Sequence, residues 1–281
     1  MFTTLIPSDS LMESLADPSW VVIDCRFVLS EPAAGERAYR QGHIPGTHYA
    51  HLERDLSSQV DASSGRHPLP DRTRLIAMLA DWGVGPATQV VVYDDVGGAM
   101  AVRLWWLLRW MGHANVALLD GGWRQWLKEG RPVATDVGPR RRSTAFTPGE
   151  PLVDWMSTAE VQDAMRHQAI QLLDARAPER FRGEVEPIDP VAGHVPGALN
   201  RPFQHNLAAD GRFLPAAELY RQFSAQLAHV APRQVVHMCG SGVTACHNLL
   251  AMEHAGLKGS RLYAGSWSEW VRDPDRPVAR G

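Results

Sequence analysis

Residues 234–250 read QVVHMCGSGVTACHNLL, and this stretch decides the fold class. An apolar run ends at Met238, a Gly-Ser-Gly loop follows Cys239, and a helix-forming segment starts at Ala245. The order predicts a buried strand, a tight loop and a helix, as in an open α/β sheet. Ligands bind such sheets at the carboxyl ends of the strands, where a thiol faces backbone N–H groups and the positive end of a helix dipole. Most lone cysteines are small buried hydrophobes, but this setting favours the thiolate, so we expect Cys239 to be a nucleophile.

The sequence carries two copies of one domain. The segment GHIPGT at residues 42–47 recurs as GHVPGA at residues 193–198, which lies 151 residues later (193 − 42). Further pairs with nearly the same offset are DCR at 24–26 with DAR at 174–176, QVV at 89–91 with QVV at 234–236, Trp123 and Trp126 with Trp267 and Trp270, and RPV at 131–133 with RPV at 276–278. A repeat of roughly 148 residues is far too long for a solenoid, so it indicates a tandem duplication of an independent fold.

Short apolar runs alternate with amphipathic stretches in each copy. Residues 20–23, 90–93 and 116–119 have the pattern of buried strands, and residues 100–111 have that of a helix. This alternation predicts the α/β class, with two tandem domains that are each a mostly parallel sheet with helices on both faces. We expect an N-terminal domain over residues 1–135, a linker over residues 136–152, where the periodicity is lost, and a C-terminal domain over residues 153–281.

The composition favours a small-molecule partner. The 281 residues include 28 basic and 31 acidic side chains, a net charge of −3, so we expect neither nucleic acid nor a membrane to bind. Three cysteines are too few for a disulfide framework, and they fit a reducing cytoplasm. The N-terminus has no basic leader, and no window approaches 18 apolar residues, so neither export nor membrane insertion is expected.

The duplication also predicts that the two copies differ in chemistry. Asp94 is equivalent to Cys239, because the QVV segments just before them set a local offset of 145 residues (234 − 89), and 239 − 145 is 94. A carboxylate cannot replace a thiolate as a sulfur nucleophile, and Asp94 and Asp95 place negative charge where an anionic substrate would bind. We therefore expect the N-terminal domain to be catalytically inactive.

Four segments belong together. They are the two GH(I/V)PG segments, the loop CGSGVT at residues 239–244 and the segment YAGSWSEW at residues 263–270. Their combination resembles the tandem rhodanese-type sulfurtransferases over nearly the whole chain. The loop is similar to the 3-mercaptopyruvate version of that family, whereas thiosulfate-specific members generally carry positive charge directly after the cysteine.

The resemblance implies a sulfurtransferase without a cofactor or a metal. The Cys239 thiolate would take sulfur from 3-mercaptopyruvate as a persulfide and pass it to a thiol or to cyanide, with thioredoxin as a candidate acceptor. Backbone N–H groups of Gly240, Gly242, Val243 and Thr244 can converge on the sulfur and stabilise both anionic forms.

Two arginines follow from the resemblance as candidates for binding the substrate carboxylate. Arg180 matches an arginine with that role in the family, and a guanidinium suits a carboxylate. The family's second such arginine is missing from residues 186–191, which read EPIDPV. Either Arg182 takes its place, or the substrate preference differs.

A Ser-His-Asp relay proposed for the mercaptopyruvate enzymes maps onto Ser241, His67 and Asp55. Such a relay could protonate the enolate leaving group, because a histidine titrates near neutral pH. An exposed loop histidine without a catalytic role is the alternative at position 67.

Other functions stay open at this point. A thiosulfate:cyanide sulfurtransferase is compatible with the missing second arginine, although the neutral loop disfavours it. The intact loop also disfavours a non-catalytic persulfide carrier or binding module. A rhodanese-fold phosphatase needs an arginine at the sixth position after the cysteine, and that position is Ala245. Cys239, Cys246 and His247 have no recognised metal-ligand spacing, so we expect no metal site.

Overall fold

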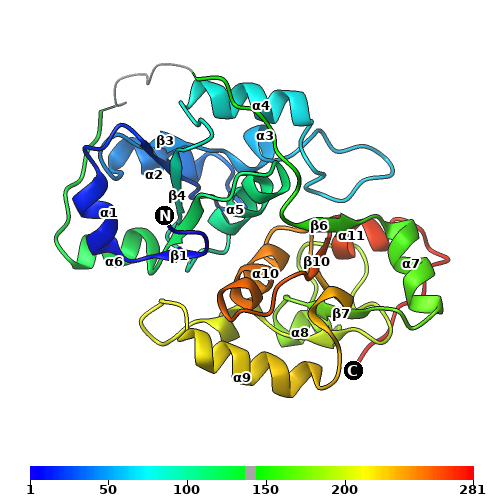
Figure 1. The fold of residues 1–281 in the computed structure, drawn as a ribbon. Coiled ribbons are helices and arrows are strands. Elements are labelled where there is room, and N and C mark those ends of the chain that lie inside the picture. The colour runs from blue at the N-terminus through cyan, green and yellow to red at the C-terminus, as the bar shows by residue number, and fades with distance from the viewer. Residues whose placement is uncertain (137–143) are drawn as a thin grey trace. The chain divides into compact units, whose positions relative to one another are not determined.

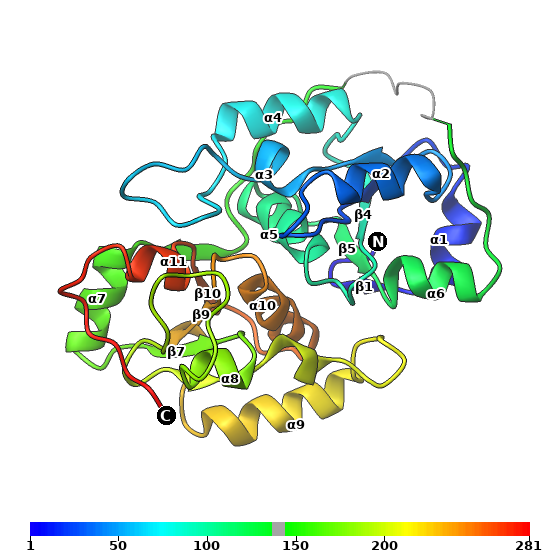
Figure 2. The ribbon, with the colours of Figure 1, turned by 180° about the vertical axis from the view of Figure 1, so that it is seen from behind.

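The computed structural model describes residues 1–136 and 144–281, which form two compact units (Figures 1 and 2). The first unit contains Met1–Ser58, Pro70–Leu152 and Ala209–Phe213, and the second contains Gln59–Leu69, Val153–Ala208 and Leu214–Gly281. Each unit thus takes one short segment from the other half of the chain. Within the predicted linker over residues 136–152, residues 137–143 lie outside the described residues, and the predicted domain boundaries stay a prediction.

The first unit is built on a five-stranded sheet in the order β1-β5-β4-β2-β3, and every pairing in it is parallel. Its strands are β1 (Leu5–Ile6), β2 (Trp20–Asp24), β3 (His48–Tyr49), β4 (Gln89–Tyr93) and β5 (Val116–Leu119). Its helices are α1 (Ser8–Ser14), α2 (Ala34–Gln41), α3 (Leu52–Asp55), α4 (Arg72–Asp81), α5 (Ala101–Trp110) and α6 (Gly122–Lys128).

The second unit repeats this sheet in the order β6-β10-β9-β7-β8, again with parallel pairings. Its strands are β6 (Asp154–Met156), β7 (Gln171–Asp174), β8 (Leu199–Asn200), β9 (Val235–Met238) and β10 (Arg261–Tyr263). Its helices are α7 (Thr158–Arg166), α8 (Pro178–Phe181), η1 (Phe203–Asn206), α9 (Ala216–Leu227), η2 (Pro232–Gln234), α10 (Ala245–His254) and α11 (Ser266–Trp270). The predicted α/β class, with parallel sheets covered by helices, is confirmed.

Buried apolar side chains hold the second sheet between its helices. On one side, Val236 and Met238 of β9 pack in a cluster with Val161 of α7 and with Trp267 and Trp270 of α11. Helix α10 packs against β9 and β10. Strands covered by helices are expected to be continuously apolar, which explains why the sequence pattern located β4 and β9 well.

The repeated Asp-x-Arg segments fix the ends of two equivalent strands. Arg176 makes a buried ion pair with Asp174 at 2.7 Å, and its guanidinium carbon lies 4.7 Å from the centre of the Trp267 ring. Arg26 pairs with Asp24 at 2.6 Å in the same way in the first unit. A buried guanidinium needs such partners, because an unpaired charge is strongly destabilising away from water.

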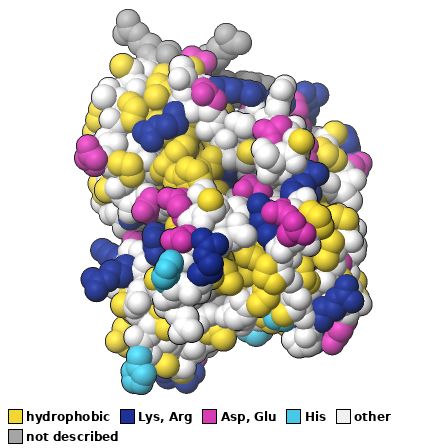
Figure 3. All heavy atoms as spheres, turned by 90° about the vertical axis from the view of Figure 1, so that its right-hand side faces the viewer, with side chains coloured by type: hydrophobic (Ala, Val, Ile, Leu, Met, Phe, Trp, Pro, Cys, Tyr) yellow, Lys and Arg dark blue, Asp and Glu magenta, His cyan; other side chains and the backbone are white. Residues whose placement is uncertain are grey.

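Surface charge is mixed in sign. Basic and acidic side chains are interspersed on the face drawn in Figure 3, as the small net charge of −3 leads one to expect. Among the described residues, no helix is long and apolar enough to span a bilayer.

Candidate active site

The loop after β9 positions Cys239 at the carboxyl end of a central strand of the second sheet. β9 lies between β10 and β7, and α10 starts at Ala245, so residues 239–244 form the connection. Gly242 has φ +76°, and a Cβ atom there would lie 2.4 Å from the carbonyl oxygen of Ala264. Only glycine fits this position, because it tolerates both the left-handed backbone and the close approach.

The segment that begins α11 holds the backbone of this loop. Ser266 Oγ accepts a hydrogen bond from the Cys239 N–H at 3.1 Å. The N–H groups of Trp267 and Ser268 donate to the carbonyls of Cys239 and Gly240 at 3.0 and 2.8 Å. Ser266 adopts φ +53°, which is strained for a residue with a side chain. Sequence reasoning missed this role of Ser266, although its counterpart in the first copy, 144 residues earlier (266 − 144), is Gly122, with φ +56°.

The equivalent loop of the first unit binds its own carboxylate. Asp94 follows β4 and is fully buried, and its Oδ1 accepts N–H bonds from Val96 and Gly98 while its Oδ2 accepts them from Met100 and Ala101, all at 2.8–2.9 Å. Burial raises the pKa of Asp94, although the four N–H groups oppose the rise. This loop is therefore a site where backbone N–H groups converge on an anion. We refer to the four N–H groups as the anion cradle.

His67 and Ser241 lie together in the second unit. The segment Gln59–Leu69 belongs to that unit, and His67 Nδ1 lies 2.7 Å from Ser241 Oγ, with both side chains almost fully buried. The structure thus brings together two of the three residues of the predicted relay, and their catalytic role stays a prediction. Asp55 belongs to the first unit, where its carboxylate accepts hydrogen bonds from the His51 N–H and the Arg54 guanidinium.

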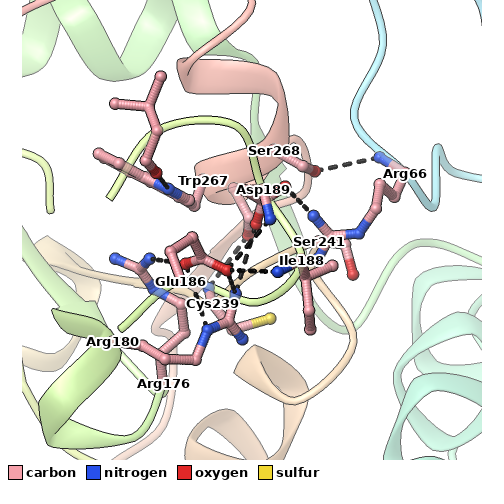
Figure 4. A network of polar contacts seen from close by, with 12 residues as sticks. Arg66, Arg176, Arg180, Glu186, Ile188, Asp189, Cys239, Ser241, Trp267 and Ser268 are labelled. Atoms are coloured by element: carbon pink, nitrogen blue, oxygen red, sulfur yellow. Dashed lines mark hydrogen bonds and ion pairs between the residues drawn. The ribbon is translucent and has the colours of Figure 1, made fainter. Parts of the chain in front are cut away.

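A row of alternating charges lies beside the Cys239 loop (Figure 4). Arg66 pairs with Asp189, and Arg180 pairs with Asp189 at 3.4 Å and with Glu186 at 2.7 Å. Arg176 reaches Glu186 at 3.4 Å. We call these five residues the arginine-carboxylate row.

The two carboxylates of the row differ in their electrostatics. Burial would raise the pKa of Glu186, but hydrogen bonds from Arg180 and from backbone N–H groups outweigh it and lower that pKa. Burial raises the pKa of Asp189, against the attraction of Arg66. The Oε1 atom of Glu186 also accepts the N–H groups of Ile188 and Asp189 at 3.1 Å, which favours the ionised form of this side chain.

The remaining predicted residues take less central positions. Arg182 is on the surface, where Nε donates to Glu184 at 2.6 Å. Val243 is buried, and Thr244 precedes the first residue of α10. Cys246 is buried within α10, and no disulfide joins Cys25, Cys239 and Cys246.

Sequence reasoning missed Arg66, Glu186 and Asp189. The stretch GRH at residues 65–67 offered one signal, since Arg66 directly precedes a candidate relay histidine. In the described residues, no group of three or more His, Cys, Asp or Glu side chains is arranged to hold a metal ion. The arrangement can do thiol chemistry, because it combines a cysteine at the start of the loop equivalent to the anion cradle, a hydrogen-bonded Ser-His pair, and guanidinium groups suited to an anionic substrate.

Comparisons with known proteins agree on one family. The sequence matches the rhodanese-like domain twice, over residues 8–129 and 157–273. It is 50% identical over 283 residues to the "Probable 3-mercaptopyruvate sulfurtransferase" of Pseudomonas aeruginosa, covering 99% of this chain and 98% of that protein. It is 32% identical over 295 residues to the thiosulfate sulfurtransferase of Rattus norvegicus, covering 100% and 97% of the two chains. The structure superimposes on the 3-mercaptopyruvate sulfurtransferase from Leishmania major with a TM-score of 0.83 at 29% identity, covering 96% of this chain and 74% of that one.

Proposed function

Because the chain belongs to the rhodanese-like domain family, we propose that it is a sulfurtransferase that moves sulfur from 3-mercaptopyruvate to a thiol or to cyanide through a persulfide on Cys239. The observation that carries the proposal is the position of Cys239, at the end of β9 and at the start of a loop whose counterpart binds an anion. The similarity to the mercaptopyruvate enzymes over nearly the full chain supports the same donor.

The first half of the reaction is an attack on the donor sulfur. The Cys239 thiolate forms an S–S bond with the sulfur of 3-mercaptopyruvate, and the C–S bond of the donor breaks. The electron pair of that bond stays on carbon, so pyruvate leaves as its enolate and Cys239 carries a persulfide. Backbone N–H groups of the loop, including those of Gly240, Gly242, Val243 and Thr244, would stabilise the anionic sulfur before and after transfer.

A proton must then reach the enolate carbon to give pyruvate. Ser241 and His67 are suited to deliver it, because their side chains share a hydrogen bond of 2.7 Å. The assignment of Asp55 as the third member of this relay remains a prediction.

The second half returns the enzyme to its starting state. A thiolate or cyanide attacks the outer sulfur of the persulfide, the S–S bond breaks, and Cys239 leaves as a thiolate. Thioredoxin is our candidate for the physiological thiol. We propose a cytoplasmic setting, which is supported by the need to keep the Cys239 thiol reduced.

Two further parts of the proposal concern the first unit and the donor carboxylate. Asp94 occupies its own anion cradle, so we propose that the first unit has no sulfurtransferase activity. We also propose that Arg180 binds the carboxylate of the donor, since its side chain belongs to the row beside the Cys239 loop.

A thiosulfate sulfurtransferase is the second candidate function. It is favoured by the absence of an arginine from residues 186–191 and by the similarity to the rat thiosulfate enzyme. The two donors differ in the group that binds, because thiosulfate has a sulfonate-like end where mercaptopyruvate has a carboxylate.

The test compares kcat/KM for the two donors with cyanide as the common acceptor and Cys239→Ser as the blank. A clear advantage for 3-mercaptopyruvate, absent in Cys239→Ser, supports the proposal. An advantage for thiosulfate would select the second candidate, and turnover in Cys239→Ser would overturn the assigned nucleophile. If neither donor is turned over, the protein is a persulfide carrier or binding module.

A further inference from the structure

We propose that Arg66 is the second arginine that binds the carboxylate of the sulfur donor, together with Arg180. The inference rests on the proposed function and assigns the donor-binding residue that residues 186–191 lack. Arg66 comes from the segment Gln59–Leu69, which the N-terminal half of the chain contributes to the second unit.

Both guanidinium groups reach the residue next to the nucleophile. A Cβ atom placed on Gly240 would lie 2.8 Å from Arg66 Nη2. The same point lies 3.6 Å from Arg180 Nη2 and 3.7 Å from Arg180 Nη1. Gly240 directly follows Cys239, so the loop that is neutral in sequence has two positive groups beside it in space.

The carboxylates of the row leave at least one guanidinium nitrogen of each arginine for a ligand. Asp189 accepts from Arg66 Nη1, and Glu186 accepts from Arg180 Nε and Nη2. No described residue accepts a hydrogen bond from Arg66 Nη2 or from Arg180 Nη1. Both of these nitrogens are among the atoms nearest Gly240. Two N–H donors that face one point match the two oxygens of a carboxylate.

The side chains are ordered but reachable. The Arg66 side chain is 25% exposed and that of Arg180 is 17% exposed, so a small anion can contact both. Asp189, with a side chain only 3% exposed, contacts both arginines. Ser268 Oγ accepts the Arg66 N–H at 3.0 Å and fixes the backbone. Asp189 is thus a positioning residue, because it holds two like charges together before the donor arrives.

The experiment separates recognition of the carboxylate from recognition of the rest of the donor. It measures KM and kcat for 3-mercaptopyruvate, and the inhibition constant of mercaptoacetone as a competitive inhibitor. Mercaptoacetone keeps the thiol and the ketone but lacks the carboxylate. The variant is Arg66→Met, and the matched control is Arg221→Met, which removes a surface arginine paired with Glu218. We expect Arg66→Met to raise KM about ten- to hundredfold, which is the contribution of a charge-assisted hydrogen bond. The inhibition constant of mercaptoacetone should stay within about twofold of its wild-type value.

A second variant tests the same geometry without removing the arginine. Gly240→Ala places a methyl group against Arg66 Nη2, so it should raise KM for 3-mercaptopyruvate in the wild-type background and add little in Arg66→Met. Because Arg66→Met and Gly240→Ala perturb the same contact from opposite sides, either variant alone tests the contact if the other folds poorly.

Two results would overturn the proposal for Arg66. One is an unchanged KM in Arg66→Met, and the other is an equal loss for mercaptopyruvate and mercaptoacetone, which would indicate a structural role for the side chain. A larger rise of KM in Arg182→Met than in Arg66→Met would transfer the role to Arg182. Failure of the proposed function is recognised separately, because wild-type protein would then not turn over 3-mercaptopyruvate at all.

Discussion

His237 makes the stability of the second unit sensitive to acid. Its side chain is fully buried on β9, opposite Leu173 of β7 and Leu262 of β10. Neither ring nitrogen has a hydrogen-bond partner among the described residues, and burial lowers the pKa of His237 to about 3. The charged imidazolium is therefore excluded from the folded strand, two residues before Cys239.

The size and sign of the effect follow from proton linkage. The unfolded chain binds a proton at His237 below about pH 6.5, while the folded chain does so only near pH 3. Protonation of His237 therefore leaves the free energy of unfolding unchanged above about pH 6.5 and decreases it as the pH falls below that value. The difference between the two pKa values lowers the free energy of unfolding by roughly 5 kcal/mol once the pH is below the folded-state pKa, and by roughly 3 kcal/mol at about pH 4.5.

The assay is urea unfolding of wild type and His237→Leu at about pH 7 and pH 4.5, followed by tryptophan fluorescence. All other titrating groups are common to both proteins, so the difference in pH dependence reports His237. We expect the variant to lose roughly 3 kcal/mol less than wild type on acidification. The control His229→Leu removes an exposed histidine and should behave as wild type. Equal acid sensitivity of wild type and His237→Leu would refute the reasoning.

Three smaller perturbations test the loops and one helix cap. Ser266→Ala removes the acceptor for the Cys239 N–H, so it should destabilise the protein by about 1–2 kcal/mol and slow persulfide formation in rapid-mixing experiments. Asp94→Ala leaves four backbone N–H groups of the anion cradle without their acceptor, so it should lower the free energy of unfolding in urea by about 3 kcal/mol or more. The neighbouring Asp95→Ala, as its control, should change this free energy little. Ser157→Ala breaks the capping box of α7 and should cost about 1 kcal/mol in thermal unfolding, while Ser157→Gly should cost only a few tenths.

Local patterns in the sequence predicted much of the architecture. A helix was expected over residues 100–111, and α5 covers Ala101–Trp110. The apolar run before Cys239 corresponds to β9, and the internal repeat predicted that Asp94 and Cys239 end equivalent strands, which they do. These features depend on hydrophobic periodicity and on turn residues, which are encoded within a few residues of one another.

The arginine-carboxylate row could not be predicted in the same way. Arg66 and Asp189 are separated by 123 positions in the chain, and no periodicity relates them. The segment Gln59–Leu69 joins the second unit although its sequence neighbours belong to the first. The family resemblance predicted the second arginine within residues 186–191 or at Arg182, because nothing in the local sequence relates residue 66 to this part of the second unit.

The two loops show how one fold produces either a structural or a chemical site. By the offset of 145, the cradle residues Val96 and Gly98 correspond to Ser241 and Val243 of the second loop. In the first unit the residue after the strand, Asp94, supplies its own carboxylate to the four N–H groups of the cradle, so these groups are already occupied and cannot bind a substrate. A cysteine at that position has no fixed charge, and it becomes an anion only as a thiolate or a persulfide. The equivalent N–H groups of the second loop would then stabilise a state that the reaction creates. Only under this condition can they lower an activation barrier, in addition to holding the loop in place.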